Sequence, residues 1–187
     1  MEMNNIYFTA DLHLGPYNHR TLAQRGFKSD WMKHMNFVMD SINKKVDRGD
    51  TLYILGDLGF KDSPEELEKF LKSLNCQKRI ALGNHDDFKI LQQLKRKNVI
   101  QNVKETFNFK YAGRFFDCSH MPKREWHNFY KNGFHLYGHT HGLLPQFYRS
   151  MDVGIDNIGY SPISINEVID ILSKYNNIDE RGNRFDI

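Results

Sequence analysis

The chain has little cysteine, no long apolar run and almost no net charge. Its two cysteines, Cys76 and Cys118, lie far apart without the spacing of metal ligands, which excludes a disulfide framework. Such cysteine use fits a reducing compartment. No stretch approaches the ~20 apolar residues that a membrane span needs. Residues 1–10, MEMNNIYFTA, lack the basic start and long apolar run of a secretion signal, so we expect a soluble cytoplasmic protein.

The overall charge predicts no particular partner. The 26 basic residues nearly balance the 23 acidic ones, and a formal net charge of +3 is too small to predict a nucleic-acid binder. An anionic substrate remains compatible with it. The sequence shows no internal repeat, low-complexity segment or linker, and 187 residues with 40% apolar side chains suffice for one core. We therefore predict a single domain over residues 1–187, with a polar tail from about residue 176.

Short apolar runs alternate with helical patterns in the first half of the chain. Residues 6–10, 51–55 and 79–82 are rich in β-formers, and each run is closed by Gly or Asp. Residues 29–46 repeat apolar side chains at helical spacing, and Ser63-Pro64-Glu65-Glu66 has the pattern of a capping box. The order strand, helix, strand, helix, strand predicts a parallel sheet. The second half is rich in strands, with a hairpin turn at Ala112-Gly113 and a last helix starting near Ser164.

Polar side chains follow all three of the early strands. Parallel strands present their carboxyl ends at one edge of a sheet, so we expect these side chains to converge there. An extended backbone would also point Asp11 and His13 to the same side. The residues concerned are Asp11, His13, Asp57, Asn84, His85 and Asp86. A local alternative is turn and capping chemistry: Asp86 is a candidate N-cap of the following helix, and Asp87 a first-turn acid.

Three further histidines follow predicted strands of the second half. His120 stands in CSHMP, and His139 and His141 stand in YGHTHGL. Together with the early residues they form a set of oxygen and nitrogen ligands without thiolates. Such a set suits Mn, Fe or Zn ions better than a closed structural zinc site.

The blocks DLH, GD, GNHD, SH and GHTH, in this order, resemble the five signature motifs of the calcineurin-like metallophosphoesterases. The resemblance covers about residues 7–153, and FTADLHLG, LGDLGF and VGIDNIGYSPISINEV look like the small bacterial and phage members that lack an added domain. It implies an α/β fold of four layers, α-β-β-α, in which two mixed sheets are flanked by helices.

The resemblance also implies a site and a reaction. Two divalent ions, Mn or alternatively Fe, Zn or Ni, would hold a hydroxide for in-line attack on a phosphate ester. His85 would face the phosphate and be oriented by Asp86. We expect the substrate to be a nucleotide or another small phosphodiester, and we expect no obligate protein partner. The implied metal ligands are Asp11, His13 and His141 for one ion, Asn84, His120 and His139 for the other, and Asp57 as the bridge.

The residues around the substrate are less defined. Pro16 stands where relatives often have histidine, whereas Asn18 matches the family pattern. Lys123, Arg124 and Trp126 follow His120, and if they form a loop beside the metals, they suit a nucleotide or a nucleic-acid end. The alternative for this segment is an ordinary solvated loop.

Other functions remain as alternatives. A phosphomonoesterase or protein phosphatase would use the same ligands, and some members of such a fold survive as interaction scaffolds after losing ligands. The presence of His85 and of all the implied ligands favours an enzyme. An HxH pair also occurs in amidohydrolases and metallo-β-lactamase-like hydrolases, but the remaining patterns of both are missing here. For the four histidines outside the motifs, surface exposure or core packing is the expectation: His19, His34, His127 and His135.

Overall fold

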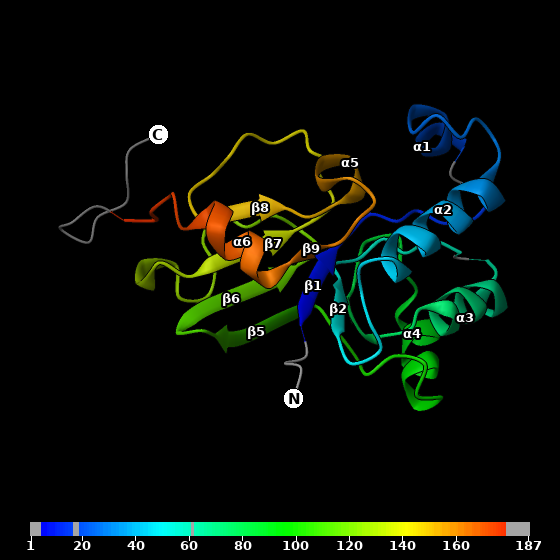
Figure 1. Ribbon diagram of the computed structural model, residues 1–187, viewed down its shortest axis with the longest axis horizontal. Helices are drawn as coiled ribbons and strands as arrows, with labels where there is room; N and C mark the ends of the chain where they lie inside the picture. Colours follow the sequence, from blue (N-terminus) through cyan, green and yellow to red (C-terminus); the bar gives the residue numbers. More distant parts are fainter. Residues whose placement is uncertain (1–4, 17–18, 61, 179–187) are drawn as a thin grey trace.

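The computed structural model describes residues 5–16, 19–60 and 62–178, and two β-sheets form its centre (Figure 1). One sheet has five strands in the order β4-β3-β2-β1-β9, and the other has four in the order β5-β6-β7-β8. The strands are β1 (Ile6–Thr9), β2 (Thr51–Ile54), β3 (Gln77–Ala81), β4 (Asn102–Lys104), β5 (Thr106–Tyr111), β6 (Arg114–Ser119), β7 (Phe134–Tyr137), β8 (Ser150–Asp152) and β9 (Ile163–Ser164). The helices are α1 (His19–Gln24), α2 (Trp31–Asn43), α3 (Pro64–Ser73), α4 (Phe88–Arg96), α5 (Ile155–Ile158), α6 (Ile165–Leu172) and the 3-10 helix η1 (Phe129–Lys131).

The five-stranded sheet is parallel except at one edge. Strands β1 to β4 pair in parallel, as the alternation of strands and helices predicts, and β9 pairs antiparallel to β1. The second sheet is also mixed: β5 and β6 are antiparallel, while β6, β7 and β8 are parallel. The carboxyl ends of β1, β2 and β3 therefore lie at the same edge of the first sheet.

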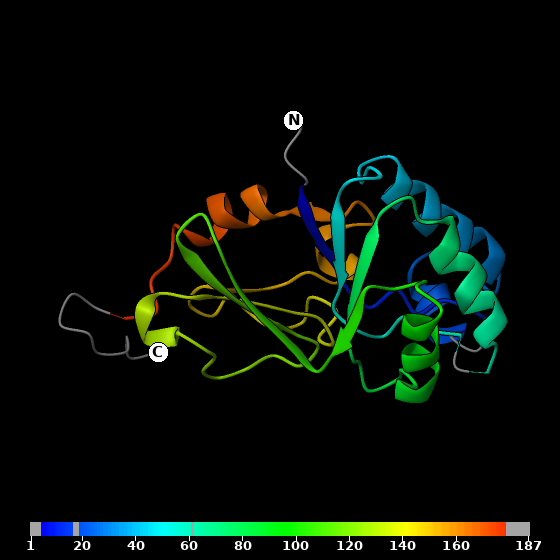
Figure 2. The same cartoon turned by 90° about the horizontal axis from the view of Figure 1, so that it is seen from below.

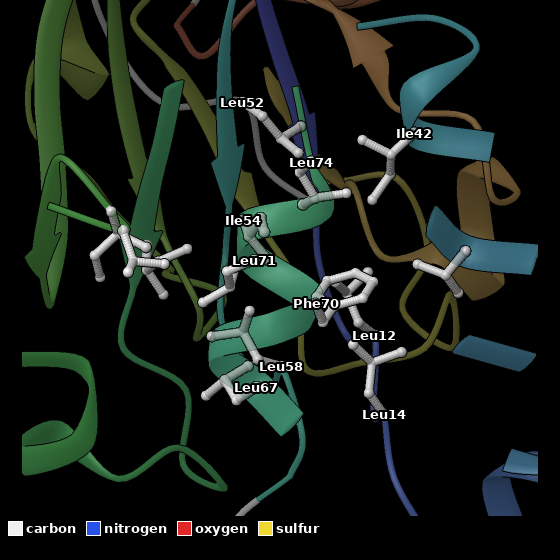
Figure 3. Packing of buried hydrophobic residues seen from close by; sticks show 14 of the residues in the cluster. Leu12, Leu14, Ile42, Leu52, Ile54, Leu58, Leu67, Phe70, Leu71 and Leu74 are labelled. Atoms are coloured by element: carbon white, nitrogen blue, oxygen red, sulfur yellow. The ribbon is translucent and has the colours of Figure 1, made fainter. Parts of the chain in front are cut away.

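Helices α2, α3 and α4 cover one face of the first sheet, the face turned away from the second sheet (Figure 2). In Figure 3, Leu52 and Ile54 of β2 face Phe70 and Leu71 of α3. All four side chains are at most 3% exposed. Burial of each such side chain stabilises the fold by about 1.5–3 kcal/mol, which holds the helix layer on the sheet.

The other face of the first sheet packs against the second sheet through aromatic rings. Phe8 of β1 stacks on Phe116 of β6 at 6.5 Å between centroids, and Tyr53 of β2 meets Phe107 of β5 at 5.2 Å. Val168 of α6 belongs to the same buried cluster. The arrangement confirms the predicted α/β fold of two mixed sheets flanked by helices.

The outer face of the second sheet is covered by the segment between β6 and β7. His135 of β7 is fully buried there, and the Trp126 ring stacks on it at 5.2 Å. Of the predicted polar tail, residues 179–187 lie outside the described residues. Asn177, however, is 0% exposed, and its amide donates to the carbonyls of Phe129 and Gly133 at 2.9 Å. The chain is therefore anchored beyond the point where we predicted the tail to start.

Two predicted helix starts need correction. Ser63 precedes Pro64 at the start of α3, but its side chain makes no capping hydrogen bond. Asp87, not Asp86, caps α4, since its carboxylate accepts from the backbone N–H groups of Lys89 and Ile90 at 2.7 and 3.3 Å. At Ser164, both hydrogen bonds of a capping box with Glu167 are present.

No helix among the described residues is long and apolar enough to cross a membrane.

Candidate metal centre

The predicted ligands lie in loops that follow β1, β2, β3, β6 and β7. Asp11, His13 and His141 each place a ligand atom within 4.8 Å of those of the others. The two imidazole Nε2 atoms of His13 and His141 are 3.2 Å apart, although the residues are 128 positions apart in the sequence. These three side chains form one half of the site, which is the set implied for the first ion.

Asn84 joins two histidines in the other half. Its Oδ1 atom lies 2.9 Å from Nε2 of His120 and 3.0 Å from Nδ1 of His139. Here too, residues from the ends of three different strands meet at one point. The set is the one implied for the second ion.

Asp57 stands between the halves. Its Oδ2 atom is 3.7 Å from Nε2 of His13 and 3.4 Å from Nε2 of His120. Its Oδ1 atom accepts a hydrogen bond from the backbone N–H of His85 at 3.0 Å. One oxygen is thus held by the protein, and the other faces ligands of both halves.

The backbone at this site is not extended, so Asp11 and His13 do not meet the condition under which we expected them to point to the same side. Residues of three loops have a positive φ, a region that side chains other than glycine adopt at a cost of order 1 kcal/mol or more. The loops after β1 and β2 support each other, since the His13 N–H donates to the Asp57 carbonyl at 2.9 Å. The residues are Asp11 (58°), His13 (46°), Asp57 (55°), His139 (68°) and His141 (50°).

Gly83 allows the loops after β2 and β3 to approach each other. A Cβ atom at Gly83 would lie 2.2 Å from Oδ1 of Asp57, so any side chain there would displace the carboxylate. The glycine of the GNHD block is therefore required by close packing.

The site has a buried floor and an accessible rim. Asp11, His13, Asp57 and His120 are at most 6% exposed. Asn84, His85 and His139 are exposed, and the His141 side chain is 33% exposed. A substrate can therefore reach the ligands from the rim, while the floor is shielded from water.

Hydrogen bonds on the far sides of the imidazoles favour cation binding. Nδ1 of His120 lies 2.8 Å from the Leu55 carbonyl, which can only accept, so this nitrogen carries the proton. In a neutral ring, Nε2 then presents a lone pair to two oxygens, Oδ1 of Asn84 and Oδ2 of Asp57. A divalent cation turns this cluster of acceptors into ligands, so the residues present fit metal ions.

Burial and neighbouring charges set the protonation of the ligands. Burial lowers the pKa of His13 to about 4, which leaves its imidazole neutral at pH 7. Burial also raises the pKa of Asp11 to about 7. Burial opposes the charge of Asp57 as well, but a His120 ring in its protonated form and the hydrogen bond from the His85 backbone keep the pKa of Asp57 below its ordinary value. The floor therefore holds one firmly ionised carboxylate and one that a nearby cation would deprotonate.

Residues 5–179 match the family model described as calcineurin-like phosphoesterase. The chain belongs to this family. The match covers nearly the whole chain and confirms the resemblance that the five motifs predict. No curated protein matches the chain.

Two solved structures are similar to this calcineurin-like phosphoesterase. A protein of unknown function from Aquifex aeolicus has 21% identity and a TM-score of 0.68, and the match covers 90% of this chain and 100% of that one. A novel archaeal phosphodiesterase has 17% identity and a TM-score of 0.44, with 80% and 82% covered. At such identities the first likeness concerns the fold alone, and the second carries no argument.

Asp86 occupies a different place in the phosphoesterase from the one we predicted. Its carboxylate accepts three backbone hydrogen bonds, from Asp57 at 3.0 Å, Leu58 at 2.9 Å and Gly83 at 2.9 Å. Among the described residues it makes no hydrogen bond to the His85 side chain. Asp86 therefore ties the loop after β2 to the loop after β3 and so positions Asp57, which corrects the prediction that it orients His85.

Sequence reasoning missed two residues behind His141. Oδ2 of Asp156 lies 2.6 Å from Nδ1 of His141, so this ligand is oriented by a carboxylate. The Arg25 guanidinium donates to Asp156 at 2.8 and 2.6 Å and to the carbonyls of Asp11 and Leu12 at 2.7 and 3.0 Å. Asp156 stands in the VGIDNIG stretch that resembles family members, so it could have been found there. Arg25 lies in no motif, so the sequence offered no signal for it.

The residues expected around the substrate have different positions. The Lys123 ammonium is bound by Asp117 at 2.7 Å, whereas Arg124 is exposed; both line a cavity beside the site. Trp126 is 6% exposed, and its indole N–H donates to the Gly133 carbonyl at 2.8 Å. This placement corrects the expectation that Trp126 is available to stack on a base. Asn18 lies outside the described residues.

Proposed function

We propose that this chain hydrolyses phosphodiesters with the help of two divalent metal ions. The observation that carries the proposal is the position of Oδ2 of Asp57, which faces ligands of both halves of the site at 3.4 and 3.7 Å. Bound ions would lower the pKa of water towards neutrality and neutralise the phosphate oxygens during in-line displacement.

Each half of the site would hold one ion. Asp11, His13 and His141 would supply two nitrogens and a carboxylate to the first. The second would receive two imidazoles and the neutral amide oxygen of Asn84, which adds no negative charge beside an anionic substrate. Asp57 would be shared between the two. This mixture of oxygen and nitrogen ligands supports Mn, with Fe, Zn or Ni as alternatives.

His85 is proposed to act on the phosphate directly. It is exposed, and its ring lies 5.8 Å from that of His13, so it stands beside the ligands without belonging to either half. In the net reaction, water adds to phosphorus, the ester P–O bond breaks and the leaving oxygen takes up a proton. An imidazole nitrogen of His85 is suited to supply this proton or to donate a hydrogen bond to a phosphate oxygen.

The shape of the rim supports a diester over a monoester. His139 and His141 lie in an open depression of about 710 Å³ that also includes Arg20, a cation for the phosphate. Leu143 and Leu144 on its border are 85% and 50% exposed. Such a site has room for two ester substituents and offers them apolar surface.

We also propose that the protein is located in the cytoplasm.

Hydrolysis of paired chromogenic substrates tests the proposal. Metal-stripped protein is supplied with Mn, Ni, Zn or Mg and assayed on bis(p-nitrophenyl) phosphate and on p-nitrophenyl phosphate, while bound metal is counted. We expect about two ions per chain and faster turnover of the diester. Faster turnover of the monoester would identify a phosphomonoesterase or protein phosphatase instead. A chain that binds no metal and hydrolyses neither compound would be an interaction scaffold.

A further inference from the structure

A cavity of about 360 Å³ lies beside the metal centre. Its walls come from the segments that follow two ligand loops: Lys123 and Arg124 after His120, and Leu144 and Phe147 after His141. Leu144 also borders the open depression that contains His139 and His141. The cavity and the metal centre are therefore neighbours, and one substituent of a phosphate bound at the metals can extend into the cavity.

The wall of the cavity offers a flat aromatic surface with a positive charge. The Arg124 guanidinium lies over the Phe147 ring at 5.7 Å from its centroid, and Arg124 makes no ion pair with any described carboxylate. The loop is braced, because Ser150 Oγ donates to the Phe147 carbonyl at 2.6 Å. Planar aromatic ligands stack well on such a pair of groups.

Tyr137 adds a polar group to the cavity. Its side chain lines the wall, and its hydroxyl makes no hydrogen bond with any described residue. A phenol hydroxyl can donate a hydrogen bond. A ligand with ring nitrogens or carbonyl oxygens would satisfy this group.

The same cavity is poorly suited to a phosphate group alone. Lys123 contributes no free charge, because its ammonium is already bound by the buried carboxylate of Asp117. Of the basic side chains that line the cavity, Arg124 alone makes no ion pair with a described residue. The remaining walls include Leu144, Phe147 and Pro122, which favour an apolar ring over an anion.

We propose that this cavity binds the nucleobase of a nucleoside-bearing phosphodiester whose phosphate lies at the metal centre. The inference rests on the proposed function and names the substrate class of that site. Phe147 and Arg124 stack on the base, Leu144 contacts it on the side of the metals, and Tyr137 donates to a heteroatom of the ring.

Two esters with the same leaving group test the subsite. The metal-loaded protein is assayed on thymidine 5′-(p-nitrophenyl phosphate) and on methyl p-nitrophenyl phosphate, which differ in the substituent that is retained. We expect kcat/KM for the nucleoside ester to exceed that for the methyl ester by about tenfold or more, because stacking of one base contributes binding free energy of this size. In Phe147→Ala this advantage is lost, while kcat/KM for the methyl ester stays within about twofold.

Further variants separate the subsite from folding defects. Leu144→Ala and Arg124→Gln change exposed side chains and should each reduce the preference for the nucleoside ester. Met32→Ala removes an apolar side chain that is 56% exposed on α2, and it should leave both rates unchanged. An equal loss on both esters in Phe147→Ala would overturn the inference and leave the proposed function intact.

Binding measurements distinguish failure of the subsite from failure of the reaction. If the protein hydrolyses neither ester, the proposed function fails, and calorimetric titration with adenosine monophosphate and with methyl phosphate tests the cavity alone. Weaker binding of the nucleotide to Phe147→Ala supports the subsite, and unchanged binding refutes it. Where the wild type is active, competition between a dinucleotide and a ten-nucleotide strand tells whether the base comes from a free nucleotide or from a nucleic-acid end.

Discussion

The two oxygens of Asp57 have different partners, which explains why the site needs a carboxylate at that position. Oδ1 is fixed by the His85 backbone, and Oδ2 is left facing His13 and His120. An amide would place an N–H group in one of the two positions, and a hydrophobic residue would leave the imidazoles without a shared partner. The residue is 2% exposed, so water cannot replace the missing oxygen easily.

Asp57→Ala should abolish activity and reduce the number of bound metals. We expect kcat to fall by at least about 10³-fold, because loss of the shared ligand removes several kcal/mol of charge stabilisation from the transition state. Metal counting and the diester assay measure the two effects. Asp170→Ala serves as the matched control, since Asp170 is an exposed carboxylate on α6. Two retained metals in Asp57→Ala would contradict the bridging role.

His85→Ala should separate metal binding from turnover. His85 is exposed and is in neither group of metal-ligand candidates, so the variant should fold and keep its metals. We expect kcat to fall by about 10²–10⁴-fold, as for the loss of a general acid. His127→Ala, another exposed histidine, should leave kcat unchanged. An undiminished rate in His85→Ala would remove this residue from the mechanism.

At the scale of the secondary-structure elements, the site depends on how loops at the strand ends hold one another. Asp86 joins the loop after β3 to that after β2 through two backbone hydrogen bonds, and a third, from Gly83, holds its own loop. Arg25, one residue beyond α1, reaches the carbonyls after β1 and the Asp156 carboxylate in α5. The short elements at the edge of the sheet are thereby held in the strained conformations that the ligands require.

Asp86→Ala should destabilise the fold much more than Asp87→Ala. The first change leaves three buried N–H groups without acceptors, and we expect a loss of about 3 kcal/mol or more in the free energy of unfolding. The second removes a helix cap, which costs about 1 kcal/mol. Denaturant unfolding measures both, and metal counting should show a loss in the first variant only. Equal destabilisation of the two neighbours would argue against the role of Asp86 as a tie between loops.

Arg25→Ala should weaken the half of the site that contains Asp11, His13 and His141. Removal of a group that orients a ligand lowers metal affinity by about 10–100-fold, and we expect this effect on one ion only. Arg25→Lys should not restore the metal affinity, because one ammonium cannot make the paired contacts to Asp156. Arg48→Ala, an exposed residue, is the control. Calorimetric metal titrations that show both ions unaffected in Arg25→Ala would exclude this role.

At the scale of the whole molecule, the metal centre joins the two sheets. Asp11, Asp57 and Asn84 follow strands of the first sheet, whereas His120 and His139 follow strands of the second. The proposed ligands from both sheets therefore add a polar junction at the end of an interface that is otherwise apolar. The site is absent from the unfolded chain, so binding of the proposed ions would be coupled to folding.

Removal of metal should lower the thermal stability of the protein. At a metal concentration of 100 times Kd, each site stabilises the fold by about 2.7 kcal/mol. This corresponds to a rise of about 5–10 °C in Tm for a domain of this size. Thermal unfolding with chelator and with restored Mn measures the shift. In Asp57→Ala, Mn should raise Tm much less than in the wild type. An equal rise in both proteins would mean that the metal binds at another site.

The sequence alone predicted most of the strands and the parallel part of the first sheet, while β4 and β9 were missed; the resemblance of five motifs predicted the family and the mixed-sheet fold. Strand propensity, helical spacing and polar residues placed directly after apolar runs are local signals, and five motifs in a fixed order add specificity. The contact between His13 and His141 across 128 positions joins loops of two different sheets, so it does not follow from the rule that parallel strands of one sheet share an edge, and only the family resemblance implied it.

Tertiary structure decided the backbone conformation of the site and the positions of two side chains, because these depend on contacts between distant parts of the chain. The positive φ angles at Asp11 and His13 depend on hydrogen bonds between loops, and propensity alone would favour extended backbone. Trp126 became a packing residue because the outer face of the second sheet had to be covered. Arg25 became part of the site because a buried guanidinium needs several acceptors, and these converge only after the chain has folded.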